Sequence, residues 1–133
     1  MFRTLTVQTA KRVEMIDVTD HVQDVVRQGN VAEGCVLCYV PHTTAGITIQ
    51  ENADPDVVAD VLYRLESLVP PCDARYRHSE GNSDAHIKAS LMGSSVLVPL
   101  RDSSLVLGTW QAIYFCEFDG PRSRSLHVQL LGG

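Results

Sequence analysis

The order of helical and strand-like segments is the feature that most constrains the fold of this chain. About seven or eight short segments have the alternation or the β-branched composition of strands, and about three have helical spacing. The strands come in groups and do not alternate with helices. This order is typical of an α+β fold with mostly antiparallel pairing, not of a doubly wound α/β sheet. With 133 residues, 44% of them hydrophobic, the sequence predicts a single domain over 1–133 with its own core.

The strand-like segments are short and lie mainly at the two ends of the chain. Phe2 to Thr9 and Arg12 to Val18 alternate in part, so we expect them to pair with each other. Further strands are expected over 34–40, 47–51, 95–100, 105–107, 112–118 and 124–131. The last two are expected to form a hairpin joined by residues 119–122.

The strongest helix signal begins at Asn52-Ala53-Asp54-Pro55. Asp54 can accept hydrogen bonds from the first turn, and Pro55 has no N–H to leave unpaired. An apolar stripe follows as far as Leu68, and two prolines then end the helix.

Two shorter helices are also expected. One begins at Thr19 and ends at Gly29. The other covers 84–92, with Ser83 as its cap and with Ile87 and Leu91 facing the core.

Charge and hydropathy exclude several classes of protein. Eleven basic and sixteen acidic residues give a formal net charge of −5, which disfavours general binding to nucleic acid or anionic membranes. No apolar run approaches the roughly 20 residues of a membrane helix, and the N-terminal segment lacks the features of a signal peptide. We therefore expect a cytoplasmic protein.

Cys35 and Cys38 would lie on opposite faces of one strand, which disfavours a shared metal site.

Polar and titratable residues gather in four loops between apolar elements. These loops are His42–Gly46, Glu51–Asp56, His78–His86 and Glu117–Arg124. Because binding and catalytic residues concentrate on loops held by a rigid scaffold, these clusters are the candidate functional sites.

The third cluster combines two histidines with a carboxylate. His78 and Glu80 would share a face of an extended backbone, and His86 would lie in the first turn of the next helix. Imidazole nitrogen and carboxylate oxygen suit zinc or manganese, and the helix N-terminus suits a phosphate. The alternative is a capped surface loop with two solvated histidines.

The fourth cluster suggests an anion site. Arg122 and Arg124 are two residues apart at a strand start, and their guanidinium groups could bind phosphate or carboxylate in a bidentate manner. The alternative is that they are solvated, or that they pair with Glu117 and Asp119.

The first cluster offers a histidine and two hydroxyl groups. His42 could be a metal ligand, a general base or a structural residue at a strand end. Thr43 and Thr44 could donate hydrogen bonds to a phosphate or could cap the turn.

Five ordered segments of this sequence closely resemble the YjbQ-like family, along nearly the whole chain. They are His42–Gly46, Glu51–Pro55, His78–Lys88, Gly108–Gln111 and Glu117–Arg122. The resemblance implies a small α+β fold with a β-sandwich-like core, assembled as a homotrimer. Members of the family are named secondary thiamine-phosphate synthases, because some can weakly replace the normal enzyme.

The activity implied by the resemblance joins a pyrimidine pyrophosphate to a thiazole phosphate and releases pyrophosphate. Such a reaction calls for a divalent metal (zinc, manganese or magnesium) and for cationic groups at the leaving group. The expected metal ligands are His42, His78 and His86. The expected catalytic residues are Glu51, Asp54, Glu80 and Asn82. The expected anion-binding residues are Thr43, Thr44, Asn52, Arg122 and Arg124.

Two alternatives to the synthase remain open at this point. One is a metal-dependent hydrolase or phosphoesterase, and the other is a non-catalytic trimer that binds a phosphate ligand. In all three cases the partner is a phosphorylated small molecule, and loops of separate subunits could complete one site.

Overall fold

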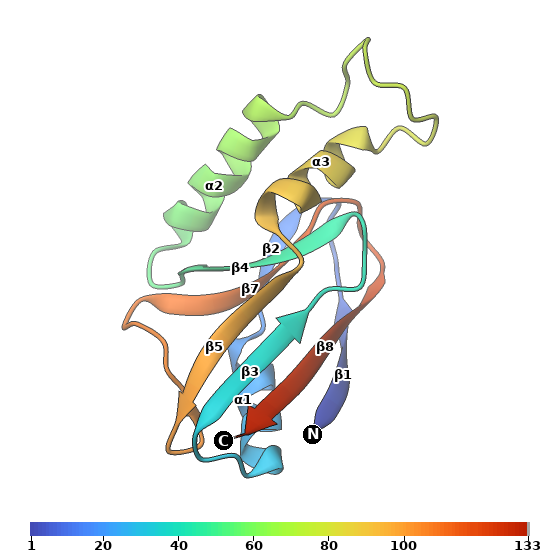
Figure 1. The fold of residues 1–133 in the computed structure, drawn as a ribbon. Helices are drawn as coiled ribbons and strands as arrows, with labels where there is room; N and C mark the ends of the chain where they lie inside the picture. Colours follow the sequence, from blue (N-terminus) through green and yellow to red (C-terminus); the bar gives the residue numbers. More distant parts are fainter. Residues whose placement is uncertain (133) are drawn as a thin grey trace.

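Two antiparallel sheets form the framework of the protein, which is described by a computed structural model over residues 1–132 (Figure 1). The elements, in chain order, are β1 (Phe2–Gln8), β2 (Glu14–Asp17), α1 (Thr19–Gly29), β3 (Gly34–Tyr39), β4 (Ala45–Glu51), α2 (Pro55–Leu68), α3 (Ser83–Met92), β5 (Ser95–Arg101), β6 (Ser104–Leu105), β7 (Gln111–Glu117) and β8 (Ser123–Gly132). The five-stranded sheet has the order β1-β8-β3-β5-β6, and the three-stranded sheet has the order β2-β7-β4. The predicted α+β class with antiparallel sheets and three helices is confirmed.

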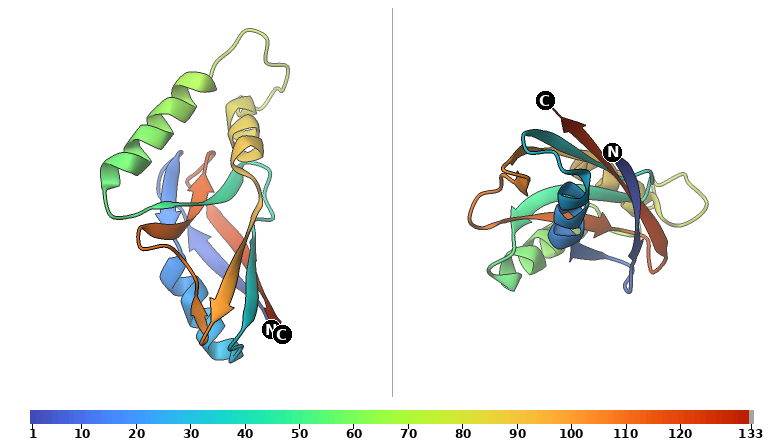
Figure 2. Two further views of the ribbon diagram at one scale, coloured as in Figure 1. Left: turned by 60° about the vertical axis from the view of Figure 1, so that its left-hand side comes forward. Right: turned by 90° about the horizontal axis from the view of Figure 1, so that it is seen from below.

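The main core fills the space between the two sheets, which curl toward each other as a half-barrel. Val36 of β3, Leu126 of β8 and Phe115 of β7 point into this core and are fully buried. Helix α1 lies between the sheets when the molecule is seen from below (Figure 2), and it contributes Val22 and Val26 to the same core. The predicted helix from Thr19 to Gly29 is therefore confirmed.

The predicted pairing of the terminal strands is wrong. β1 pairs with β8 and β2 pairs with β7, so the two N-terminal strands belong to different sheets, and so do the two C-terminal strands. Between β1 and β2, and again between β7 and β8, the chain crosses from one sheet to the other, and these two crossings lie side by side. The amide of Thr9 donates to the carbonyl of Arg122 at 3.0 Å, and the amide of Gly120 donates to that of Arg12 at 3.0 Å. Neither the β1–β2 connection nor the β7–β8 connection is a two-residue hairpin turn, so neither forces the two strands that it joins to pair. The pairing of these strands is determined instead by burial of their apolar faces.

Helix α2 lies beside the three-stranded sheet as an outer layer (Figure 1). Asp54 caps it as predicted, since its carboxylate accepts a hydrogen bond from the amide of Asp56 at 2.9 Å. The apolar stripe is only partly covered, because Val58 and Leu65 pack against the second core cluster but no residue of the helix is fully buried.

The buried face of α3 differs from the prediction. Ile87 and Leu91 are exposed, whereas the side chains of Asp84, Ala85, Lys88 and Ala89 are buried. The small alanines let the helix approach β4 closely. A Cβ atom on Gly46 of β4 would lie only 2.8 Å from the carbonyl oxygen of Gly93, directly after the helix. No helix within residues 1–132 is long and apolar enough to cross a membrane.

Candidate functional site

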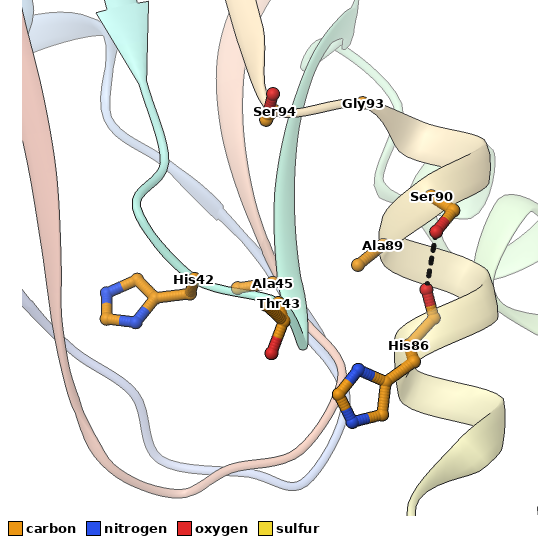
Figure 3. A pocket seen from close by; sticks show the side chains of 8 residues that line it. All are labelled: His42, Thr43, Ala45, His86, Ala89, Ser90, Gly93 and Ser94. Carbon is orange, nitrogen blue, oxygen red and sulfur yellow. Dashed lines mark hydrogen bonds between the residues drawn. The ribbon is translucent and has the colours of Figure 1, made fainter.

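A pocket of about 430 Å³, called here the central pocket, separates α3 from the loop between β3 and β4 (Figure 3). It is lined by His42, Thr43, Ala45, His86, Ala89, Ser90, Gly93 and Ser94. Two of the predicted clusters meet here, because His42 and Thr43 come from the first cluster and His86 from the third.

His42 is held in one tautomer by the backbone of β8. Its Nε2 accepts a hydrogen bond from the amide of Ser125 at 2.9 Å, so the neutral ring carries its proton on Nδ1. Burial, and next the charge of Arg124, lower the pKa of His42 and favour this neutral form. His42 is therefore a fixed hydrogen-bond donor through Nδ1, and its Nε2 lone pair is already used.

A buried ion pair lies behind this loop. Arg124 donates from Nε to Glu117 Oε1 at 2.9 Å and from Nη2 to Glu117 Oε2, and its Nη2 also donates to the hydroxyl oxygen of Thr44 at 2.9 Å. The side chain of Arg124 is 3% exposed and that of Glu117 is 0% exposed. The predicted anion-binding residues Arg124 and Thr44 thus bind each other and Glu117, and they fix the loop that carries His42.

The charge of Glu117 is stabilised on several sides. The hydroxyl of Thr9 donates to Oε1 at 2.8 Å, and the amide of Asp119 donates to Oε2 at 3.1 Å. Burial alone would raise the pKa of Glu117, but the hydrogen bonds from Arg124, Asp119 and Thr9 together hold it below its ordinary value. Of the alternatives predicted for Arg124, this geometry supports pairing with Glu117.

The third cluster is assembled at the start of α3. The rings of His78 and His86 pack edge to face with centroids 5.4 Å apart, and His78 Nε2 lies 3.6 Å from Glu80 Oε2. His42 is separated from them by the central pocket. Within residues 1–132, no three His, Cys, Asp or Glu side chains already converge as metal ligands.

A second pocket, of about 400 Å³, adjoins the first at His86, and we call it the arginine pocket. It is lined by Arg75, Tyr76, Arg77, His78, Ser83, His86 and Ile87. Sequence reasoning missed Arg75 and Arg77, which lay in a stretch interpreted only as a polar loop. The available signal was the placement of two cations two residues apart, directly before His78.

Other predicted site residues have different surroundings and do not line either pocket. Asp54 caps α2, and the side-chain amide of Asn52 donates to Asp17 at 3.3 Å. Glu51 ends β4, and its carbonyl accepts a hydrogen bond from the hydroxyl of Tyr114 at 3.2 Å. These residues of the second cluster are not brought together with the histidines.

Asn82 and Arg122 meet at one carboxylate. The side-chain amide of Asn82 donates to Asp119 Oδ2 at 2.9 Å, and Arg122 Nη2 donates to the same oxygen at 3.1 Å. The side chain of Arg122 is half exposed, and the buried Oδ1 atom of Asn82 has no hydrogen-bond partner among the described residues. Asp119 thereby ties the start of α3 to the crossing between β7 and β8.

Helix α3 is also anchored by a second buried ion cluster. Asp84, which is 0% exposed, accepts two hydrogen bonds of 3.1 Å from the guanidinium of Arg12. Lys88 Nζ lies 3.4 Å from Asp84 and 2.8 Å from Glu66 of α2. Burial would raise the pKa of Asp84, but Arg12 first and then Lys88 lower it below its ordinary value. This cluster sets the position of the helix that presents His86 to both pockets.

These features define a small α+β protein in which two antiparallel sheets and a short helix border the central pocket and the arginine pocket, neither of which has an acidic lining residue. A model of the family described as UPF0047 protein YjbQ-like matches residues 3–133. The chain belongs to this family.

Similar proteins occur in both bacteria and archaea. The UPF0047 protein YugU of Bacillus subtilis is 49% identical over 132 residues, which are 99% of this chain and 100% of that protein. The UPF0047 protein MJ1081 of Methanocaldococcus jannaschii is 48% identical, over 95% of this chain and 91% of that one. A crystal structure of an uncharacterized family member from Clostridium acetobutylicum superimposes with a TM-score of 0.95 at 48% identity, covering 97% of this chain and 99% of that one. A protein of unknown function from Sulfolobus solfataricus gives a TM-score of 0.94 at 32% identity, covering 100% and 97% of the two chains.

Proposed function

We propose that this protein binds and transforms a phosphorylated small molecule in the central pocket. The observation that carries the proposal is the composition of the pocket wall. The chain has sixteen acidic and eleven basic residues, yet the wall contains no carboxylate. The wall includes the imidazoles of His42 and His86 and the hydroxyl groups of Thr43 and Ser94, and the ring of His42 is turned away from that of His86 (Figure 3). Such a wall of hydrogen-bond donors suits the oxygen atoms of a phosphate group.

The resemblance to secondary thiamine-phosphate synthases supplies the first candidate reaction. In that reaction the thiazole nitrogen attacks the methylene carbon of the pyrimidine substrate, and the bond from this carbon to the pyrophosphate oxygen breaks. Negative charge develops on the leaving group, where hydrogen-bond donors such as His42 would stabilise it. The residues of this chain would bind and orient the two phosphorylated reactants.

The arrangement of the third cluster favours a second candidate, the metal-assisted hydrolysis of a phosphate ester. His78, His86 and Glu80 have the donor atoms that zinc or manganese prefers, and these three would hold the metal. We assign His42 to hydrogen bonding with the substrate and not to the metal, because its Nε2 already accepts from Ser125. A bound metal would supply Lewis-acid stabilisation of phosphoryl oxygens.

Loss of the His86 side chain is expected to weaken binding of inorganic phosphate by about tenfold or more, because a hydrogen bond to a charged group is worth about 1.5–3 kcal/mol. Titration calorimetry with phosphate on the wild type and on His86→Ala measures this. His21→Ala, on the exposed side of α1, is the matched control and should bind like the wild type. Equal affinities in all three proteins, or no binding to the wild type at millimolar phosphate, would contradict the proposal. Separate assays for pyrophosphate release and for phosphate release from a simple ester distinguish the two reactions.

We also propose that the protein is a homotrimer, as the family resemblance implies, and that copies meet through the outer face of the five-stranded sheet. On this face Leu37 lies opposite Leu97, and the exposed side chains of Phe2, Tyr39 and Leu131 lie on the same side. The outward positions of its strands β1, β3, β5 and β8 include no carboxylate. Identical copies can therefore meet there without repulsion between acidic groups.

Introducing a charge on this face is expected to dissociate the assembly. Light scattering coupled to size exclusion should give about three times the 14.6 kDa chain mass for the wild type and a smaller mass for Leu97→Glu. Leu68→Glu adds the same charge at the far end of α2 and should keep the wild-type mass. A monomeric wild type, or a Leu97→Glu variant of unchanged mass, would refute the assignment of this face.

A further inference from the structure

The geometry points to a second anion subsite in the arginine pocket, so that the ligand carries a further phosphate group beyond the one in the central pocket. This inference rests on the proposed phosphate site. It narrows the ligand to small molecules that bear two phosphate groups, either joined as a diphosphate or placed at two ends of a short molecule.

The charges that line the arginine pocket favour an anionic ligand. Its lining residues include Arg75, Arg77, His78 and His86 and no acidic residue, although the carboxylate of Glu80 lies 3.6 Å from the ring of His78. Arg12, Arg122 and Arg124 each have a carboxylate partner. By contrast, the guanidinium groups of Arg75 and Arg77 form no hydrogen bond or ion pair with any of residues 1–132. Two unpaired guanidinium groups at one pocket leave their donors free for the forked geometry of a phosphate.

The loop that carries these arginines has hydrogen bonds of its own within residues 70–76. The amide of Arg75 donates to the carboxylate of Asp73 at 2.8 Å, and the amide of Tyr76 donates to the carbonyl of Asp73 at 3.0 Å. The hydroxyl of Tyr76 donates to the carbonyl of Pro70 at 2.8 Å. This local order reduces the conformational entropy that the loop loses when a ligand binds.

The start of α3 adds a second attraction for an anion. Ser83 opens the helix and lines the arginine pocket, and the side chain of the preceding Asn82 does not cap the helix. Its amide group donates to Asp119 instead. The amide of Ala85 donates to the carbonyl of Asn82 at 3.0 Å, so the amides of Ser83 and Asp84 are the ones without an acceptor among residues 1–132. They lie at the end of the helix where the dipole favours negative charge.

The two pockets share His86, in the first turns of α3, as a common lining residue. A phosphate bound at Thr43 and Ser94 and another bound at Arg75 and Arg77 would flank the same imidazole. The central pocket alone would recognise a monophosphate, so the arginine pocket would provide selectivity for the doubly phosphorylated ligand.

Titration of the wild-type protein with inorganic phosphate, pyrophosphate and propane-1,3-diol bisphosphate tests the subsite. We expect at least one of the two-phosphate probes to bind tenfold or more tightly than inorganic phosphate. In the Arg75→Gln/Arg77→Gln double variant this preference should be lost, while the affinity for inorganic phosphate should change by less than about threefold. Both arginines are exposed and unpaired, so the fold should tolerate the substitutions.

A matched double variant separates a local effect from general electrostatics. Arg3→Gln/Arg64→Gln makes the same change in net charge at exposed positions on strand β1 and helix α2, away from both pockets, and it should retain the wild-type preference. The inference is overturned if Arg75→Gln/Arg77→Gln still prefers a two-phosphate probe over inorganic phosphate, or if the control variant loses this preference to the same extent. Either result leaves the proposed central site intact. If the wild type binds none of the three probes, the proposed function fails as well.

Discussion

Replacing Arg124 with Met is expected to lower the free energy of unfolding by about 3–5 kcal/mol, because it leaves the fully buried charge of Glu117 without its cationic partner. The hydroxyl of Thr9 and the amide of Asp119 still donate to this carboxylate, but they carry no full positive charge. Urea denaturation of wild type and Arg124→Met at neutral pH measures the difference. The slope of the transition should stay the same if the denatured state is unaffected.

The matched control removes both charges. Glu117→Gln/Arg124→Met should be more stable than Arg124→Met alone, because the glutamine keeps an acceptor for Thr9 without burying a charge. A loss of stability in Arg124→Met below about 1 kcal/mol would show that the ion pair adds little to the fold. Equal stabilities of the single and double variants would show that the cost comes from lost packing and not from the buried charge.

Local chemistry made the helices predictable. The Asp54 cap with Pro55 behind it indicated the start of α2, and the predicted helix from Thr19 to Gly29 matches α1. These signals act within a few residues, so no knowledge of tertiary contacts is needed to interpret them.

The strand partners could not be inferred in the same way. The segments that form β1 and β2 alternate as strands should, but alternation specifies a buried face and not the strand that pairs at the edge. Their partners β8 and β7 lie about a hundred residues away in the chain. Similarly, the burial of Asp84 and Lys88 in place of Ile87 and Leu91 depends on Arg12, which is distant in sequence.

The candidate site was predictable only in its local parts. Sequence spacing brought together His78, Glu80 and His86, and the structure places these residues next to one another. The same spacing argument suggested an anion site at Arg122 and Arg124. However, β8 begins only at Ser123, so Arg122 lies before the strand, whereas Arg124 occupies an inward-pointing position and is buried against Glu117.

Replacing Asp84 with Asn is expected to have the second large effect on stability, about 3 kcal/mol, because it removes the carboxylate shared by Arg12 and the buried Lys88. Lys88 would keep only Glu66, whose side chain is 49% exposed. Lys88→Met should cost less, since Asp84 then keeps both hydrogen bonds from Arg12. Urea denaturation of the two variants measures this order, and an Asp84→Asn variant at least as stable as Lys88→Met would contradict it.

The same substitution connects the fold to the ligand site. Asp84 and His86 lie within the first turns of α3, and the carboxylate of Asp84 anchors this end of the helix to Arg12. We therefore expect Asp84→Asn to weaken phosphate binding severalfold even under conditions where the variant is fully folded. Arg124→Met should also affect binding, but through the loop that carries His42. If folded Asp84→Asn binds phosphate like the wild type, the buried ion cluster stabilises the helix without positioning His86. The position of α3 would then be set by its close contact with Gly46 of β4.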